Sequence, residues 1–132
     1  MSNKNKSSID VCFLIASSAK KSYQKLSETY AAIEPPTWAL LLAQSCRSIG
    51  FKVSIVDANA EKLSNEQIEK RINQLNPKIV CLVVYGQNVN AGTTNMRGAV
   101  DITNFLKSKN ILYPIAFIGS HVQALPLETL KI

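Results

Sequence analysis

Three polar segments could bind or transform a ligand, and each directly follows an apolar run of the chain. Hydroxyl and lysine side chains fill residues 17–34, glycine and amide side chains fill residues 86–93 (GQNVNAGT), and residues 119–121 read Gly-Ser-His. Hydroxyls, amides and exposed backbone N–H groups hold a polar ligand by hydrogen bonds. The glycines at 86 and 119 either let a flat ligand approach the backbone or form turns where strands end.

Four single residues near these segments allow two interpretations each. His121 is the only histidine, but no Asp or Glu stands in a motif beside it, which favours a surface or helix-capping role over proton transfer. Asp57 either binds a ribose hydroxyl or starts an Asx turn, and the absence of a G-x-G-x-x-G segment favours the turn. Trp38 fits a core position better than a stacking platform, and Tyr85 fits either a pocket lining or a cap on the core.

Length and composition indicate one folded domain. The 132 residues are 46% hydrophobic and 18% charged, which gives a chain of ordinary domain size enough apolar material for a core. The net charge of +6 is dispersed, with no run of Lys and Arg interleaved with aromatics, so nucleic acid is not an expected partner. No signal-peptide core and no apolar run near the ~20 residues of a membrane span is present, so we expect a cytoplasmic location and no membrane partner.

The three cysteines do not have the spacing of a metal site. Cys12, Cys46 and Cys81 lie singly within apolar runs, which predicts small buried side chains in a reducing compartment. The sequence contains no C-x-x-x-C-x-x-C motif, so we expect no iron–sulfur cluster of that type in this chain.

Apolar runs alternate with helical patterns, and this alternation sets the expected fold. Predicted strands cover residues 9–16, 52–57, 79–85 and 113–119. The last two are almost continuously apolar, which is typical of parallel strands covered on both faces. The predicted class is therefore α/β: a Rossmann-like or flavodoxin-like doubly wound parallel sheet in three α/β/α layers, with strand order 2-1-3-4. Residues 1–8 are expected to form a disordered polar tail, and residues 9–132 the domain.

Four helices are predicted from caps and periodicity. The first begins at Pro35-Pro36 and ends at Gly50, the second begins with a capping box of Ser64 and Gln67, the third covers residues 94–108, and the fourth begins at Pro126. The expected inward-facing residues share 3.6-residue spacing and are Trp38, Leu41, Leu42, Ser45 and Ile49 in the first helix, Ile68, Ile72 and Leu75 in the second, and Met96, Ala99, Val100, Thr103 and Leu106 in the third.

The predicted sheet lacks a fifth strand that this strand order normally carries. The run 113–119 then becomes an apolar edge, which natural proteins normally pair, cover or charge. We therefore expect a second chain, or a further domain of a longer protein, to cover it. Ligands of open parallel sheets bind beyond the carboxyl ends of the strands, here between the first and third strands.

Three segments resemble a known family, in the right order and at the right spacing. They are PPTWALLLAQSCRSIGFKVSIVDA (35–58), NPKIVCLVVYGQN (76–88) and PIAFIGSHVQALPLETL (114–130). Together they resemble the N-terminal cobalamin (B12)-binding domain of cobalamin-dependent radical SAM enzymes. The histidine motif D-x-H-x-x-G of another class of cobalamin domain is absent, since residues 17–22 read SSAKKS. Ser120 stands in place of the second glycine of the family's Gly-Gly pair, and the glycine of the family's PP-x-GL segment is also replaced in the stretch that begins at Pro35.

The resemblance implies a Rossmann-like domain that holds cobalamin on the carboxyl rim of its sheet. It implies no catalytic residue and no metal ligand, because this chain would carry the cofactor rather than catalyse alone. The iron–sulfur cluster and S-adenosylmethionine would belong to a radical SAM domain that this sequence does not contain. The residues that the resemblance assigns to the cofactor are Pro36, Thr37, Trp38, Tyr85, Gly86, Gln87, Asn88, Gly119, Ser120 and His121, and Ser17 joins them as a candidate from the polar segment after the first predicted strand. The phosphate of the cofactor's nucleotide tail would suit backbone N–H groups or Lys20 and Lys21.

Two other interpretations stay open at this point. One is a flavodoxin-like interaction module without a cofactor, which covers its open sheet edge with a partner chain. The other is a small enzyme or nucleotide-binding fragment that uses His121.

Overall fold

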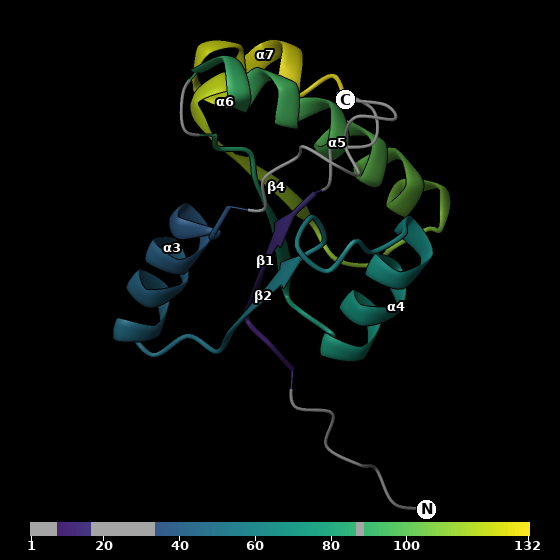
Figure 1. The fold of residues 1–132 in the computed structure, drawn as a ribbon. Helices are drawn as coiled ribbons and strands as arrows, with labels where there is room; N and C mark the ends of the chain where they lie inside the picture. Colours follow the sequence, from purple (N-terminus) through teal and green to yellow (C-terminus); the bar gives the residue numbers. More distant parts are fainter. Residues whose placement is uncertain (1–7, 17–33, 87–88) are drawn as a thin grey trace, which may run out of the picture.

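Four parallel strands form one sheet in the order β2-β1-β3-β4 (Figure 1). The computed structural model describes residues 8–16, 34–86 and 89–132. The strands are β1 (Val11–Ile15), β2 (Val53–Asp57), β3 (Ile79–Val83) and β4 (Ile115–Ile118). The register places Phe13 of β1 between Ile55 and Cys81. The predicted fold class and strand order are confirmed, although each strand is shorter than its apolar run.

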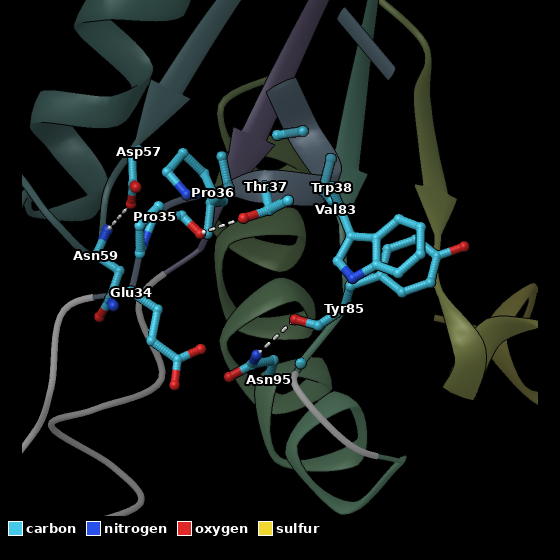
Figure 2. A pocket seen from close by; sticks show the side chains of 13 residues that line it. Glu34, Pro35, Pro36, Thr37, Trp38, Asp57, Asn59, Val83, Tyr85 and Asn95 are labelled. Atoms are coloured by element: carbon cyan, nitrogen blue, oxygen red, sulfur yellow. Dashed lines mark hydrogen bonds between the residues drawn. The ribbon is translucent and has the colours of Figure 1, made fainter. Parts of the chain in front are cut away.

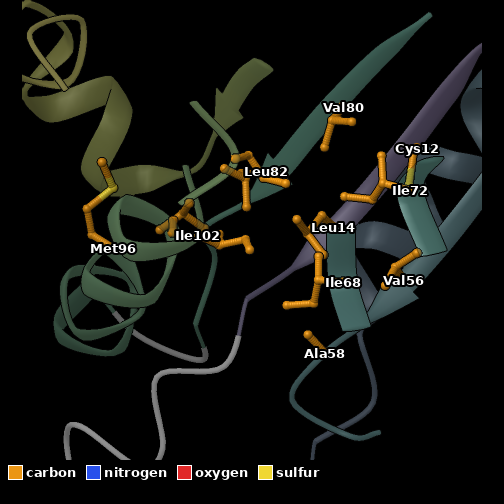
Figure 3. Close-up of a cluster of buried hydrophobic side chains, with 13 residues drawn as sticks. Cys12, Leu14, Val56, Ala58, Ile68, Ile72, Val80, Leu82, Met96 and Ile102 are labelled. Atoms are coloured by element: carbon orange, nitrogen blue, oxygen red, sulfur yellow. The ribbon is translucent and has the colours of Figure 1, made fainter. Parts of the chain in front are cut away.

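Successive residues of each strand face opposite layers of the structure, as the pleat of a strand requires. Cys12 and Leu14 face a core shared with α4 (Asn65–Leu75) and α5 (Val89–Ser108), whereas Phe13 faces α3 (Thr37–Ser48). Figure 1 shows α3 on one side of the sheet and both α4 and α5 on the other. Figure 3 shows the larger core, in which strand residues meet Ile68, Ile72, Met96 and Ile102. Both faces of β1 are therefore covered, which explains its uninterrupted apolar sequence.

The face that α3 turns toward the sheet differs from the predicted one. Ala39 and Ala43 are buried, while Trp38, Leu41 and Ile49 expose 49%, 58% and 74% of their surface. One residue along a helix rotates a side chain by about 100°, so the buried stripe lies beside the predicted one. Small alanines let α3 lie close to the sheet, and large side chains at these positions would hold it away.

Of the two helices on the other face, α4 begins where the sequence predicted and α5 does not. The capping box of α4 is present, since Ser64 Oγ accepts from Gln67 N (3.3 Å) and Gln67 Oε1 accepts from Ser64 N (2.8 Å). Asn76 ends α4 in the left-handed conformation. The prediction for α5 was wrong at its start, because the helix begins at Val89 and not at 94. The predicted loop 86–93 is therefore mostly the first turn of α5.

The chain leaves the sheet through two short helices beyond the carboxyl end of β4. They are α6 (Ser120–Ala124) and α7 (Pro126–Thr129), and Figure 1 shows them at the end of the molecule opposite the N-terminus. Each residue of β4 is half-buried, and within the described residues β4 pairs with β3 alone. Among the helices described, none has the length and apolar character needed to cross a membrane.

Candidate functional site

A cavity of about 210 Å³ lies at the carboxyl ends of β1, β2 and β3. Its position is the one that the sheet topology predicts for a ligand. Figure 2 shows side chains from the strand ends, the start of α3 and the second turn of α5 gathered around it. The residues that line it are Ile15, Glu34, Pro35, Pro36, Thr37, Trp38, Ala39, Asp57, Asn59, Val83, Tyr85, Gly86 and Asn95.

One end of the cavity is an aromatic pair. The rings of Trp38 and Tyr85 are stacked, with centroids 4.6 Å apart and planes 21° apart (Figure 2). Asn95 Nδ2 donates a hydrogen bond of 2.9 Å to the backbone oxygen of Tyr85. The pair therefore has a fixed position: α3 supplies one ring, the segment just after β3 supplies the other, and α5 supplies the amide that anchors it. Trp38 was predicted to be a core residue, and instead it is half-exposed in a stacked pair at the rim.

The other end of the cavity is polar. Asp57 ends β2, and its Oδ1 accepts from the backbone N–H groups of Asn59 (3.1 Å) and Ala60 (2.9 Å). This is the Asx turn that the sequence favoured. The turn also places the carboxylate of Asp57 in the wall of the cavity, where Glu34 supplies a second carboxylate. Thr37 Oγ1 is turned to the backbone oxygen of Pro35, at 3.4 Å.

The structure brings together five of the residues that the family resemblance assigned to the cofactor. Pro36, Thr37, Trp38, Tyr85 and Gly86 all line the cavity. Ser17, Gln87 and Asn88 lie outside the described residues, as does most of the predicted loop 17–34 and the polar tail except Ser8. The remaining three, which are Gly119, Ser120 and His121, lie at the start of α6 and do not line this cavity.

His121 contacts α5 and not the cavity. Its Nδ1 lies 3.2 Å from Thr93 Oγ1, within hydrogen-bonding distance. This contact ties the start of α6 to the first turns of α5. Across residues 8–16, 34–86 and 89–132, no three His, Cys, Asp or Glu side chains gather in a group that could hold a metal ion.

The glycines at 86 and 119 are accounted for by packing within the protein. A Cβ atom at 86 would lie 2.7 Å from the backbone carbon of Ala91 and 2.8 Å from Gly92 N. A Cβ atom at 119 would lie against the Val84 carbonyl, 2.7 Å from its carbon. These glycines allow α5 and β4 to approach the end of β3. Their role is therefore a close backbone approach, made here by the chain itself.

Four polar or charged lining residues did not figure among the predicted cofactor contacts. Asp57 was considered only for a ribose or a turn, and Glu34, Asn59 and Asn95 were not singled out. Asn59 could have been found from the sequence, because it lies two residues after the end of a predicted strand, on the edge of the sheet where a ligand is expected. Asn95 gave no such signal, because the sequence placed it at the second position of a helix predicted to begin at residue 94, whereas α5 begins five residues earlier, at Val89.

Comparison with known proteins agrees with this architecture. A family model described as the B12 binding domain matches residues 23–132. The chain belongs to the B12-binding domain family. No curated protein and no solved structure matches the chain. The match covers β2, β3 and β4 and every residue that lines the cavity except Ile15; β1 and its last residue, Ile15, precede the match.

The cavity of this B12-binding domain suits part of a large flat ligand. A corrin ring is broad, flat and fringed with amide side chains, and it requires an apolar surface with hydrogen-bonding groups around it. The Trp38–Tyr85 pair supplies a partly exposed aromatic surface, and the Asp57 end supplies hydrogen-bond acceptors. Small-molecule sites typically measure about 300–1,000 Å³, so a cavity of about 210 Å³ is large enough for only a part of such a ring.

Proposed function

We propose that this domain holds cobalamin across the carboxyl rim of its sheet and presents it to a radical SAM domain that carries the catalytic groups. The observation that carries the proposal is the cavity between the start of α3 and the ends of β1, β2 and β3, with its stacked aromatic pair. Five of the residues that resemble the family's cofactor contacts meet there.

The residues of this chain would bind and orient the cofactor. When bound, cobalamin supplies a cobalt centre that carries an alkyl group. Trp38 and Tyr85 would contact a flat part of the ring, Gly86 would line the cavity beside them, and Asp57 and Asn59 would meet polar groups at its edge. Gln87, Asn88, Gly119, Ser120 and His121 complete the proposed contacts by resemblance, with Ser17 as a further candidate. No residue of this chain is proposed as a catalyst, and the proposed setting is the cytoplasm.

Retention of cobalamin by the purified chain tests the binding proposal. The chain is mixed with micromolar hydroxocobalamin and desalted, and the visible spectrum of the protein fraction is recorded. We expect about one equivalent of red chromophore to remain. A colourless protein fraction at saturating cofactor would contradict the proposal, provided that circular dichroism shows the chain to be folded.

The radical SAM context is tested separately. We expect the gene to encode a C-x-x-x-C-x-x-C motif after the codon for Ile132, because that motif holds the iron–sulfur cluster of such enzymes. The cluster and S-adenosylmethionine would then belong to that domain. A reading frame with no such motif anywhere in the protein, and no separate radical SAM chain that co-purifies, would contradict this part.

A second candidate function is a cofactor-free interaction module, and the observation that favours it is the edge of the sheet. The β4 residues are apolar and half-buried, and Leu112, just before β4, is 100% exposed. Sedimentation velocity distinguishes the candidates. If a second copy pairs along β4, the chain is a dimer without cobalamin. If instead a radical SAM domain covers β4 in the whole protein, this chain alone is a monomer that aggregates at high concentration, because its apolar edge is then uncovered.

A further inference from the structure

The described lining of the cavity is acidic, whereas the chain as a whole is basic. The chain carries 15 basic and 9 acidic residues, a net charge of +6. The described lining of the cavity nevertheless contains two carboxylates, Asp57 and Glu34, and no Lys, Arg or His. A basic protein that binds a phosphate-bearing cofactor by simple charge attraction would place lysine or arginine there. The polar end of this cavity therefore suits a different part of the ligand.

Asp57 is held in place as a hydrogen-bond acceptor. Two backbone N–H groups, from Asn59 and Ala60, donate to its Oδ1 and fix the carboxylate at the end of β2. Within the described residues no hydrogen bond or ion pair involves Oδ2. An ionised carboxylate only accepts hydrogen bonds. Asp57 can therefore complete its bonding with an N–H or O–H of a ligand, and it repels a negative group.

A corrin ring carries both kinds of group in nature. Its edge bears primary amides in the finished cofactor, and free carboxylic acids in incompletely amidated forms. A primary amide donates two N–H groups, whereas a carboxylate in the same place puts two negative charges side by side in a half-buried site. The amide and the carboxylic acid forms differ at one side chain of the corrin edge, and the shape of the ring is the same in both.

We propose that the Asp57 end of the cavity is a specificity site that accepts a primary amide of the corrin edge and excludes a carboxylate there. The domain then selects fully amidated corrinoids from their carboxylate precursors. Glu34, which also lines the cavity, adds a second negative charge to the same selection. The nucleotide phosphate of the cofactor would then be bound outside the described part of this cavity. This inference rests on the proposed cobalamin binding.

The test compares ligands that differ by one amide. The probes are cyanocobalamin, cobinamide, which lacks the nucleotide phosphate, and the cyanocobalamin monocarboxylic acids, in each of which one side-chain amide is hydrolysed. Dissociation constants are measured by equilibrium dialysis near pH 7. We expect cobinamide to bind, and at least one positional isomer of the monocarboxylic acids to bind about tenfold more weakly than cyanocobalamin.

Asp57→Asn tests the residue itself. Asparagine keeps the Oδ1 acceptor for both turn N–H groups and adds an N–H that can donate to a carboxylate, so we expect the discrimination to fall to about threefold or less. Glu128→Gln removes the same charge from α7, away from the cavity, and should leave the ratio unchanged. Equal urea midpoints for the variants and the wild type show that the turn is intact.

The outcomes separate this inference from the function on which it rests. If neither cyanocobalamin nor cobinamide binds, both fail. If they bind and every monocarboxylic acid binds within about threefold of cyanocobalamin, cobalamin binding stands and the specificity site is wrong. The same holds if Asp57→Asn and Glu128→Gln change the ratio equally, because the effect then reflects net charge and not this carboxylate.

Discussion

The indole of Trp38 stacks on the phenol of Tyr85 with ring centroids 4.6 Å apart, although 47 positions separate the two residues in the chain. The pair joins the first turn of α3 to the end of β3, on either side of the cavity. Asn95 fixes the backbone at Tyr85 by its 2.9 Å hydrogen bond. Three separate elements thus hold one partly exposed aromatic surface beside the carboxyl ends of the strands.

The Trp38–Tyr85 pair predicts an optical signal for cofactor binding. Trp38 is the only tryptophan, so selectively excited tryptophan fluorescence reports on the rim alone. Cobalamin absorbs strongly, and we expect its binding to quench this fluorescence to saturation. Trp38→Ala removes one ring of the contact and should weaken binding by about three- to tenfold, since aromatic contacts contribute about 0.5–1.5 kcal/mol beyond burial.

Leu41→Ala is the matched control, because Leu41 is exposed on the same helix but does not line the cavity. It should leave the dissociation constant, measured by equilibrium dialysis, unchanged. Equal affinities of Trp38→Ala and the wild type would show that the aromatic pair is not part of the cofactor site.

The sequence predicted best those features that depend on neighbouring residues. The capping box of Ser64 and Gln67 is a contact between residues three apart, and the structure contains it as predicted. The apolar runs predicted the strands and their order, because each strand alternates between two covered faces. Such features need no knowledge of what packs against the segment.

The features that the sequence missed depend on distant parts of the chain. Ala39 faces the sheet because it is small enough for the helix to approach, and a larger neighbour such as Trp38 is directed to the rim. Helix α5 begins at Val89, and Asn95 in its second turn lies at the cavity and binds the backbone of Tyr85. In the first turn of α5, Gly92 lies so close to α6 that a Cβ atom at 92 would be 2.9 Å from Ser120 Oγ. Periodicity describes one helix at a time and carries no information on such contacts.

Burial predicts that the three cysteines differ in reactivity. Burial raises the pKa of Cys12 to about 12, with a smaller effect from Cys81, and burial likewise raises the pKa of Cys81. Both thiols are protonated at neutral pH and shielded from solvent, so they are poor nucleophiles. Cys46 is only half-buried. We expect a thiol reagent such as Ellman's reagent to modify one cysteine first in the native protein, and the other two only at the rate of unfolding.

Cys46→Ser should remove the fast phase and leave the slow phase intact. Mass spectrometry of the peptides identifies the labelled residue. Rapid labelling of Cys12 in native protein would contradict the buried position of β1.

Asp10 predicts a loss of stability in acid. Its side-chain hydrogen bond with Lys78, whose Nζ lies 2.6 Å from Oδ1, and a 2.8 Å bond from Lys52 N to Oδ2 hold the pKa of Asp10 below its ordinary value of 3.8. Because the folded pKa is the lower one, the contribution is present above the unfolded pKa and is lost as pH falls through the folded pKa. Asp10→Asn should therefore lower the urea midpoint at about pH 6, and the gap to wild type should shrink near about pH 3.

Glu128→Gln serves as the control, since it removes a carboxylate that makes no described ion pair. It should shift the urea midpoint little at either pH. A gap between Asp10→Asn and wild type that stays constant down to about pH 3 would mean that the charge of Asp10 is not the cause.

Substitution by alanine is expected to destabilise the protein far more at Gly119 than at Gly50. At 119 a Cβ atom would press on the Val84 carbonyl, whose residue also donates from its N–H to Ile118 O at 2.7 Å. Gly119→Ala must push the start of α6 away from β3, and we expect it to lower the free energy of unfolding by about 3 kcal/mol. Gly50 has a φ of 96° but no atom within 4 Å of its Cβ position, so Gly50→Ala adds only backbone strain of about 1 kcal/mol. Urea unfolding followed by circular dichroism measures both. If Gly119→Ala proves as mild as Gly50→Ala, then β3 and the start of α6 are not in the close contact described, and the glycine at 119 is free to serve a ligand.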